Sequence, residues 1–163
     1  MNEPSTGDVF LIPLDEERCG IGQVAGEWES ELYVVVYDKV VPRDAVATDI
    51  DGAGLQFAAL TLDAKFYHGD WQIIGNRRDN LTQLPQPWFK VRISGVPYIE
   101  ARDRSVSRPA TAEEASVLRN RTVSSPAVIE GALRAYHGLE EWLPHYDKLR
   151  ADYACQSSRL LGG

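Results

Sequence analysis

The sequence predicts an α+β fold, with a mostly antiparallel, twisted N-terminal sheet followed by two or three C-terminal helices packed on it. Up to about residue 100, the apolar runs are short, rich in β-branched and aromatic residues, and divided by Gly, Pro or Asp, as is typical of strands. After Ser107 the apolar spacing becomes helical. The chain of 163 residues has the length of one compact domain. We expect this domain to span residues 1–155 and a flexible tail to span residues 156–163.

Two N-terminal runs, residues 8–14 and 32–41, are apolar on both alternating faces. They therefore predict central strands that are covered on two sides. Residues 19–25 are expected to pair with the first run through the polar turn at 15–18.

Two further runs, residues 56–66 and 71–74, predict a second strand pair connected by the turn at 68–70. In residues 88–93, apolar and basic side chains alternate, which predicts an edge strand with one solvated face. Strand order does not follow from these patterns, and whether the sheet curls into a partial barrel stays open.

Three helices are predicted in the C-terminal part. The first spans residues 112–121 and opens with the Thr-x-x-Glu spacing of a capping box. The second is capped by Ser125, followed by proline at its first position, and ends at Gly138. A third begins near Pro144, because proline would break a helix that ran through it.

The net charge is −7, and the excess of acids lies in residues 1–64. That segment has 13 acidic residues and three basic ones, a charge of −10. Such a surface repels the phosphate backbone of nucleic acids and suits a basic protein partner. The alternative interpretation is that the acids only solvate the surface of a small domain.

The most informative acidic cluster flanks Trp28, just before an apolar strand. An exposed aromatic side chain surrounded by carboxylates is typical of a binding hot spot for a basic protein. The alternative is that Trp28 covers the core. The candidate partner-binding residues are Asp15, Glu16, Glu17, Glu27, Trp28, Glu29, Glu31, Asp49 and Asp51.

No arrangement of residues typical of a catalytic site is present, so we predict that the protein is not an enzyme and uses no cofactor and no metal. The three histidines do not have the spacing of metal ligands. Gly20 and Gly22 match only a fragment of a dinucleotide-binding motif, which favours a turn or a strand bulge. His68 and Asp70 could form an acid–base pair, but their place in a glycine-containing turn favours a turn role.

The longest uninterrupted apolar run, residues 32–37, is far shorter than the about 20 residues of a membrane-spanning helix. Residues 1–8 have neither a secretory signal nor a transit peptide. We therefore expect a cytoplasmic protein without a membrane or nucleic-acid partner. The oligomeric state does not follow from the sequence.

Four segments carry a family resemblance through their order and spacing. They are residues 7–14 (GDVFLIPL), 19–24 (CGIGQV), 69–75 (GDWQIIG) and 84–90 (LPQPWFK). Together they resemble the immunity protein 26 family of bacterial polymorphic toxin systems. Residues 127–136, Trp142 and residues 146–147 are similar to the C-terminal part of that family. The resemblance covers about residues 6–150 and implies a cytosolic antidote that binds and neutralises a toxin domain, but it supplies no contact residues.

The sequence thus favours a toxin-neutralising immunity protein whose toxin has a basic surface, and a nuclease is one candidate for that toxin. Two alternatives stay open. One is a small barrel-like nucleic-acid-binding module, because a Gly-Asp-Val-Phe opening also begins some RNA-cleaving toxin barrels, although the acidic charge argues against it. The other is a small hydrolase that uses His68 and Asp70.

Overall fold

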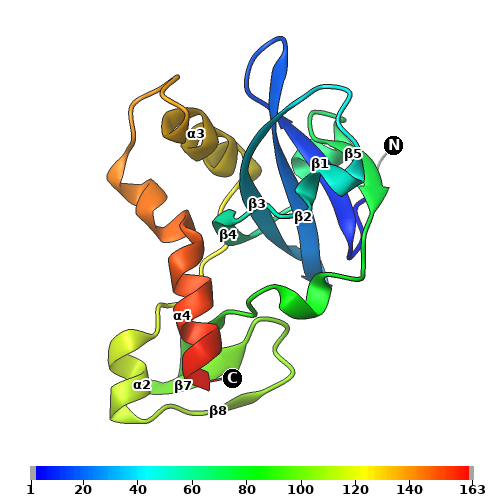
Figure 1. The fold of residues 1–163 in the computed structure, drawn as a ribbon. Coiled ribbons are helices and arrows are strands. Elements are labelled where there is room, and N and C mark those ends of the chain that lie inside the picture. The colour runs from blue at the N-terminus through cyan, green and yellow to red at the C-terminus, as the bar shows by residue number, and fades with distance from the viewer. Residues whose placement is uncertain (1–2, 162–163) are drawn as a thin grey trace. The chain divides into compact units, whose positions relative to one another are not determined.

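The computed structural model describes residues 3–161 and confirms the α+β class (Figure 1). The chain forms two compact units, which subdivide the region that the sequence analysis treats as one domain. Unit 1 comprises the residues up to Thr82 together with Val123–Ala151, and unit 2 comprises Gln83–Thr122 and the residues from Asp152 onward.

Unit 1 is built on a five-stranded antiparallel sheet with the strand order β4-β3-β2-β1-β5. Its strands are β1 (Asp8–Pro13), β2 (Arg18–Trp28), β3 (Glu31–Pro42), β4 (Leu55–Thr61) and β5 (Gln72–Asn76). Within the described residues the sheet is open, with β4 and β5 at its edges.

Strands β1 and β3 are central and covered on both faces, as predicted. Phe10 and Ile12 point to one face of β1, and Val9 and Leu11 point to the other. None of these four side chains is more than 3% exposed. In β3, the Val35 side chain is likewise fully buried.

The predicted strand pair of residues 56–66 and 71–74 is wrong. Strand β4 pairs with β3 and strand β5 pairs with β1, so the two lie at opposite edges of the sheet. Between them the chain forms the short helix α1 (Ala64–Tyr67), which is followed by Gly69 at a φ of 81°. The glycine-containing turn at 68–70 therefore ends a helix and does not connect two paired strands.

Helix α3 (Pro126–Tyr136) packs on the sheet of unit 1 and has the ends that the sequence predicts. Ser125 Oγ accepts a hydrogen bond from Val128 N at 3.3 Å, and Pro126 occupies the first turn. Gly138, at a φ of 79°, follows the last residues of the helix.

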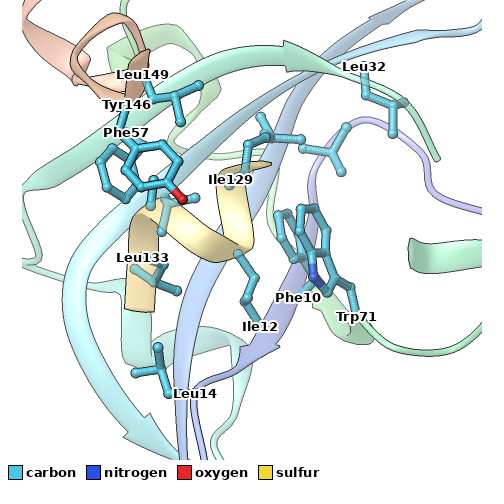
Figure 2. Packing of buried hydrophobic residues seen from close by; sticks show 14 of the residues in the cluster. Phe10, Ile12, Leu14, Leu32, Phe57, Trp71, Ile129, Leu133, Tyr146 and Leu149 are labelled. Atoms are coloured by element: carbon cyan, nitrogen blue, oxygen red, sulfur yellow. The ribbon is translucent and has the colours of Figure 1, made fainter. Parts of the chain in front are cut away.

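The core of unit 1 lies between α3 and one face of the sheet (Figure 2). Ile129 and Leu133 of the helix are fully buried against sheet residues such as Phe10. The Trp71 ring stacks on the Phe10 ring, with centroids 5.3 Å apart and an angle of 10° between the planes.

On the other face of the sheet, a buried polar network fixes the chain after β5. Gln23 is fully buried, and its Nε2 donates to Asn80 Oδ1 at 3.0 Å and to the Arg77 carbonyl at 2.8 Å. The Tyr37 hydroxyl donates to Gln23 Oε1 at 2.7 Å. Burial raises the pKa of Tyr37 to about 12. The short helix η1 (Ala47–Ile50) lies against β3 and β5.

Unit 2 contains a three-stranded antiparallel sheet with the order β6-β7-β8. Its strands are β6 (Trp88–Ile93), β7 (Val96–Ala101) and β8 (Ser107–Pro109). Strand β6 lies at an edge, as predicted, whereas β7 and β8 are not anticipated by the sequence analysis. Ser94 and Gly95 connect β6 to β7 with positive φ values of 51° and 80°, as a two-residue hairpin turn requires.

The remaining helices are α2 (Ala112–Val117), α4 (Ala151–Leu161) and the short helices η2 (Leu81–Gln83) and η3 (Pro144–Leu149). The predicted capping box is present in α2, where Glu114 N donates to Thr111 Oγ1 at 3.1 Å. This helix ends at Val117, earlier than predicted.

Helix α3 packs on the five-stranded sheet, and η3, where the predicted third helix begins, contacts β4 of the same sheet. In unit 2, α2 lies against β7 and α4 against β6. The Tyr153 hydroxyl of α4 donates to the Trp88 carbonyl of β6 at 2.5 Å. Residues 156–161, which the sequence analysis assigns to a flexible tail, belong to α4. Residues 162–163 of that expected tail lie outside the described residues.

Candidate functional site

Four candidate residues lie at the tip of the hairpin that β2 and β3 form. We call this group the hairpin tip: Glu27, Trp28, Glu29 and Glu31. Trp28 pairs with Glu31 across the hairpin, so Glu29 and Ser30 form the two-residue turn. Glu29 has a φ of 53°, the left-handed conformation that such a turn imposes.

The side chains of the hairpin tip differ in exposure. Glu27 and Glu29 are exposed, whereas Trp28 and Glu31 are half-buried. Glu27 Oε1 accepts a hydrogen bond from Thr6 Oγ1 at 3.3 Å. The exposure of the Trp28 indole therefore lies between the two interpretations of the sequence analysis, an exposed binding residue and a buried residue that covers the core.

Three further candidates form the acidic loop between β1 and β2: Asp15, Glu16 and Glu17. Asp15 Oδ2 forms an ion pair with Arg18 Nε at 2.7 Å, and its Oδ1 accepts backbone hydrogen bonds from Glu17 and Arg18. These bonds, with the Arg18 side chain foremost, lower the pKa of Asp15. Within the described residues, the exposed Glu16 and Glu17 carboxylates have no hydrogen-bond or ion-pair partner.

The last two candidates, Asp49 and Asp51, have local structural partners. Asp49 Oδ2 accepts a hydrogen bond from Val46 N at 2.9 Å, which fixes the start of η1. Asp51 Oδ1 pairs with Arg77 Nη1 at 3.0 Å, and Arg77 also pairs with Asp79 at 2.9 Å. The charge of Asp51 is thus partly compensated.

The hairpin tip and the acidic loop lie at opposite ends of β2. This strand has 11 residues, which corresponds to roughly 35 Å of extended chain. Figure 1 shows the two loops at opposite ends of the sheet. The nine candidates therefore do not form one patch.

A group of exposed apolar side chains that the sequence analysis does not single out follows α3. We call it the α3–η3 patch: Tyr136, Leu139, Trp142 and Leu143. Tyr136 is 39% exposed, Leu139 45% and Leu143 37%. The half-buried Trp142 ring stacks on Phe57 with centroids 6.2 Å apart. A tryptophan and two leucines in a short interhelical loop are the sequence signal that could have indicated this patch.

The sequence has two short clusters of arginines, at residues 77–78 and 102–108, and most of these arginines are paired with carboxylates. Besides Arg77, Arg108 pairs with Glu114 at 2.8 Å and Arg104 with Glu100 at 3.5 Å. Arg102 donates two hydrogen bonds to Gln86 Oε1. This arrangement differs from the unpaired cations that bind a phosphate backbone.

His68 and Asp70, the acid–base pair of the hydrolase alternative, have different local partners. The His68 ring, at the end of α1, contacts the Tyr67 ring, and Asp70 Oδ2 lies 3.9 Å from Lys65 Nζ. Across residues 3–161, no group of three or more His, Cys, Asp or Glu side chains could hold a metal ion. A search of the same residues finds no helix with the length and apolar character needed to cross a membrane.

Comparison with protein families gives a match to the model of immunity protein 26 over residues 5–97, more than half of the chain. The match confirms the resemblance and includes both the hairpin tip and the acidic loop. The similarity noted for residues 127–147, and with it the α3–η3 patch, lies beyond the matched range. No curated protein and no solved structure matches the chain. The chain belongs to the immunity protein 26 family.

Proposed function

We propose that this immunity protein binds a toxin domain with a basic surface and neutralises it by covering its reactive cleft, without catalysing a reaction itself. Family membership supports the immunity role. The observation that carries the choice of a basic toxin is the charge of −10 in residues 1–64. The whole of this segment lies in unit 1.

The exposure of individual carboxylates supports this proposal. Glu16, Glu17 and Glu29 are exposed at the two ends of the sheet, and Asp38 and Asp44 are exposed near the end of β3. Carboxylates in such positions attract a positively charged partner and raise its association rate. A basic cleft that binds phosphates is the chemistry that such a surface fits best, so we propose a nuclease as the toxin.

The test uses the toxin domain that we expect to be encoded beside the gene of this protein. Co-expression of the wild-type protein with the active toxin should restore growth. Binding to a catalytically inactive toxin variant is then measured at low and high salt. We expect association to be at least about tenfold faster at low salt, because the opposite charges of the two surfaces are less screened.

Charge-reversal variants test which group of acidic residues raises the association rate. E16K/E17K changes the acidic loop and E27K/E29K changes the hairpin tip, while E113K/D152K makes the same change in net charge at exposed positions of unit 2. The proposal requires that at least one unit 1 variant slows association more than the unit 2 control does. Equal association rates for all three variants, or absence of growth rescue by the wild type, would contradict it.

A further inference from the structure

We propose that the α3–η3 patch and the acidic loop together form the surface that docks the toxin, with the patch as the apolar anchor and the carboxylates as its rim. This inference rests on the proposed function. It adds the place on unit 1 where the toxin docks. Exposed acidic residues lie at both ends of the sheet, so they do not by themselves identify the docking end.

Helix α3 runs along the sheet towards the acidic loop. Near its N-terminus, Ser124 N donates to the Leu60 carbonyl at 2.9 Å, and Leu60 pairs with Tyr33 close to the hairpin tip. Near its C-terminus, Leu133 lies directly against Gly20, three residues after Glu17, the last residue of the acidic loop. The patch that follows α3 therefore lies at the acidic-loop end of unit 1.

A further contact places the patch beside this end. The Tyr136 hydroxyl donates to Asp38 Oδ2 at 3.4 Å. His137, the next residue, has its pKa lowered mainly by burial, and the charges of Asp38 and Arg18 also act on it. Apolar and acidic side chains thus share one end of the sheet.

The patch is held in a defined conformation. Leu139 N donates to the Arg134 carbonyl at 2.9 Å and Gly138 N donates to the Ala135 carbonyl at 3.0 Å, which together form a Schellman motif. This motif fixes the direction in which the chain leaves α3. A surface that is already ordered loses less conformational entropy when it binds.

The aromatic part of the patch is equally fixed. Trp142 Nε1 donates to Asp147 Oδ1 at 2.9 Å, and the Arg150 guanidinium lies 4.4 Å from the centroid of the indole ring. Tyr136 contacts the edge of the same Phe57 ring on which Trp142 stacks. Tryptophan and tyrosine are the residues that most often dominate binding energy at protein interfaces.

The charges around the patch favour a basic partner over a second copy of this chain. The exposed carboxylates of Asp38 and Glu141 adjoin the patch, and Glu16 and Glu17 lie at the same end of the sheet. Arg134 of α3 is engaged by Glu130 and Glu140. Arg150, whose guanidinium lies over the Trp142 ring, pairs with Asp147 at 3.7 Å. Two copies docked through this surface would bring carboxylates of like charge together. Lys148 is an exposed basic residue of η3 that moderates the negative charge without reversing it.

The hairpin tip lacks a comparable anchor. Trp28 is half-buried, as Trp142 is in the patch, but the other three members of the hairpin tip are glutamates, whereas the other three members of the patch are exposed apolar or aromatic side chains. An acidic surface without an apolar centre accelerates encounter but contributes little to the lifetime of a complex. Leu62, which follows Thr61, the partner of Leu32, is 41% exposed near the hairpin tip. The acidic-loop end differs because there two exposed leucines flank a tryptophan that is held in place.

The test replaces the two exposed leucines by glutamate in L139E/L143E. This variant removes apolar surface and adds negative charge, so a partner held by charge alone would bind it as fast or faster. The matched control I93E/V96E makes the same change at the β6–β7 turn of unit 2, where Ile93 is 47% exposed and Val96 is 48% exposed. Dissociation from the inactive toxin domain is measured for both, and thermal unfolding confirms that each is folded. L139Q/L143Q serves as a second, uncharged variant.

We expect L139E/L143E and L139Q/L143Q to dissociate at least about tenfold faster than the wild type, as loss of an interface anchor predicts. The control should dissociate at the wild-type rate. An unchanged dissociation rate in both leucine variants would overturn the inference while leaving the proposed function intact. A wild-type protein that neither binds nor neutralises the toxin would overturn both. A concentration-dependent dimer in solution that L139E abolishes would assign the patch to a second copy and also overturn it.

Discussion

Phe10 and Gly22 face each other on neighbouring strands so closely that a side chain does not fit between them. A Cβ atom on Gly22 would lie 2.7 Å from Phe10 Cζ and 2.8 Å from the Val35 carbonyl oxygen. The backbone oxygen can shift only if the ladder between β2 and β3 is distorted. This close approach explains why glycine occupies a strand that is buried on both faces.

Replacement of Gly22 by alanine should therefore destabilise the protein by about 1–3 kcal/mol, the usual cost of overpacking a core. Gly54→Ala is the matched control, because a Cβ atom there meets nothing within 4 Å and the backbone is not left-handed. We expect the control to change the free energy of unfolding by less than about 0.5 kcal/mol. Urea unfolding of both variants measures the difference, and equal stabilities would contradict this account of the core.

The features of the fold that can be predicted from the sequence are those that depend on neighbouring residues. Ser125 and Gly138 bound a helix, and Gly20 and Gly22 flank an irregular step in the pairing of β2 with β3, because capping and bulges depend on a few adjacent residues. The partner of a strand depends on distant segments. Residues 68–70 have the composition of a hairpin turn, yet the burial of Trp71 against Phe10 places β5 beside β1.

The difference between features set by neighbouring residues and features set by distant segments also applies to the candidate site. The acids at Glu16 and Glu29 can be assigned to turns because polar residues separate two apolar strands there. For Leu139 and Leu143 the sequence offers only their place in a loop between two predicted helices, because their exposure follows from how α3 and η3 pack on the sheet. Strand β8, with three residues, is too short to show a period in the sequence.

A buried ion pair in unit 2 leads to a second stability prediction. Glu100 Oε1 lies 2.8 Å from Arg121 Nη1, and the two side chains are only 11% and 7% exposed. Glu100→Ala would leave the Arg121 guanidinium buried without this carboxylate, which typically costs about 3–5 kcal/mol. Glu113→Ala, at an exposed position of the same unit, should cost less than about 1 kcal/mol.

Urea unfolding followed by circular dichroism measures both variants. A loss at Glu100 no larger than the loss at Glu113 would show that the pair does not stabilise unit 2.

The buried hydroxyl of Tyr37 predicts a loss of stability at alkaline pH. It donates to Gln23 and accepts from Asn80 Nδ2 at 3.1 Å, and burial raises its pKa from about 10 to about 12. The unfolded chain releases this proton near pH 10, whereas the folded protein keeps it until about pH 12. The contribution is fully present below pH 10 and is lost as the pH rises through this interval.

Tyr37→Phe removes the titrating group, so its free energy of unfolding should fall less steeply between these pH values. The other tyrosines titrate in both proteins and cancel in the comparison. Denaturant unfolding across this interval provides the measurement. Parallel pH profiles for the wild type and the variant would show that Tyr37 does not retain its proton in the folded state.

The purified protein should not bind nucleic acid. Arg77, Arg104 and Arg108 are paired with carboxylates, and the acidic segment repels phosphates. Filter binding with single- and double-stranded RNA and DNA at low salt, where electrostatic attraction is strongest, should retain no labelled strand. Tight binding would favour the nucleic-acid-binding alternative over the toxin-neutralising function.

The division of unit 1 into two segments of chain has a consequence for synthesis in the cell. The ribosome completes all five strands of its sheet before the 40 residues of Gln83–Thr122 emerge, and only then does it produce α3. Until that point the nascent chain exposes Phe10, Ile12 and Phe57 on an uncovered apolar face, which is a hazard for aggregation. Residues Gln83–Thr122 form a long loop between the two segments of unit 1. Closing a loop of this length slows folding much more than it lowers the final stability. A chain truncated before Val123 would therefore keep this apolar face uncovered, and unit 1 can complete its fold only once the last quarter of the chain is being translated.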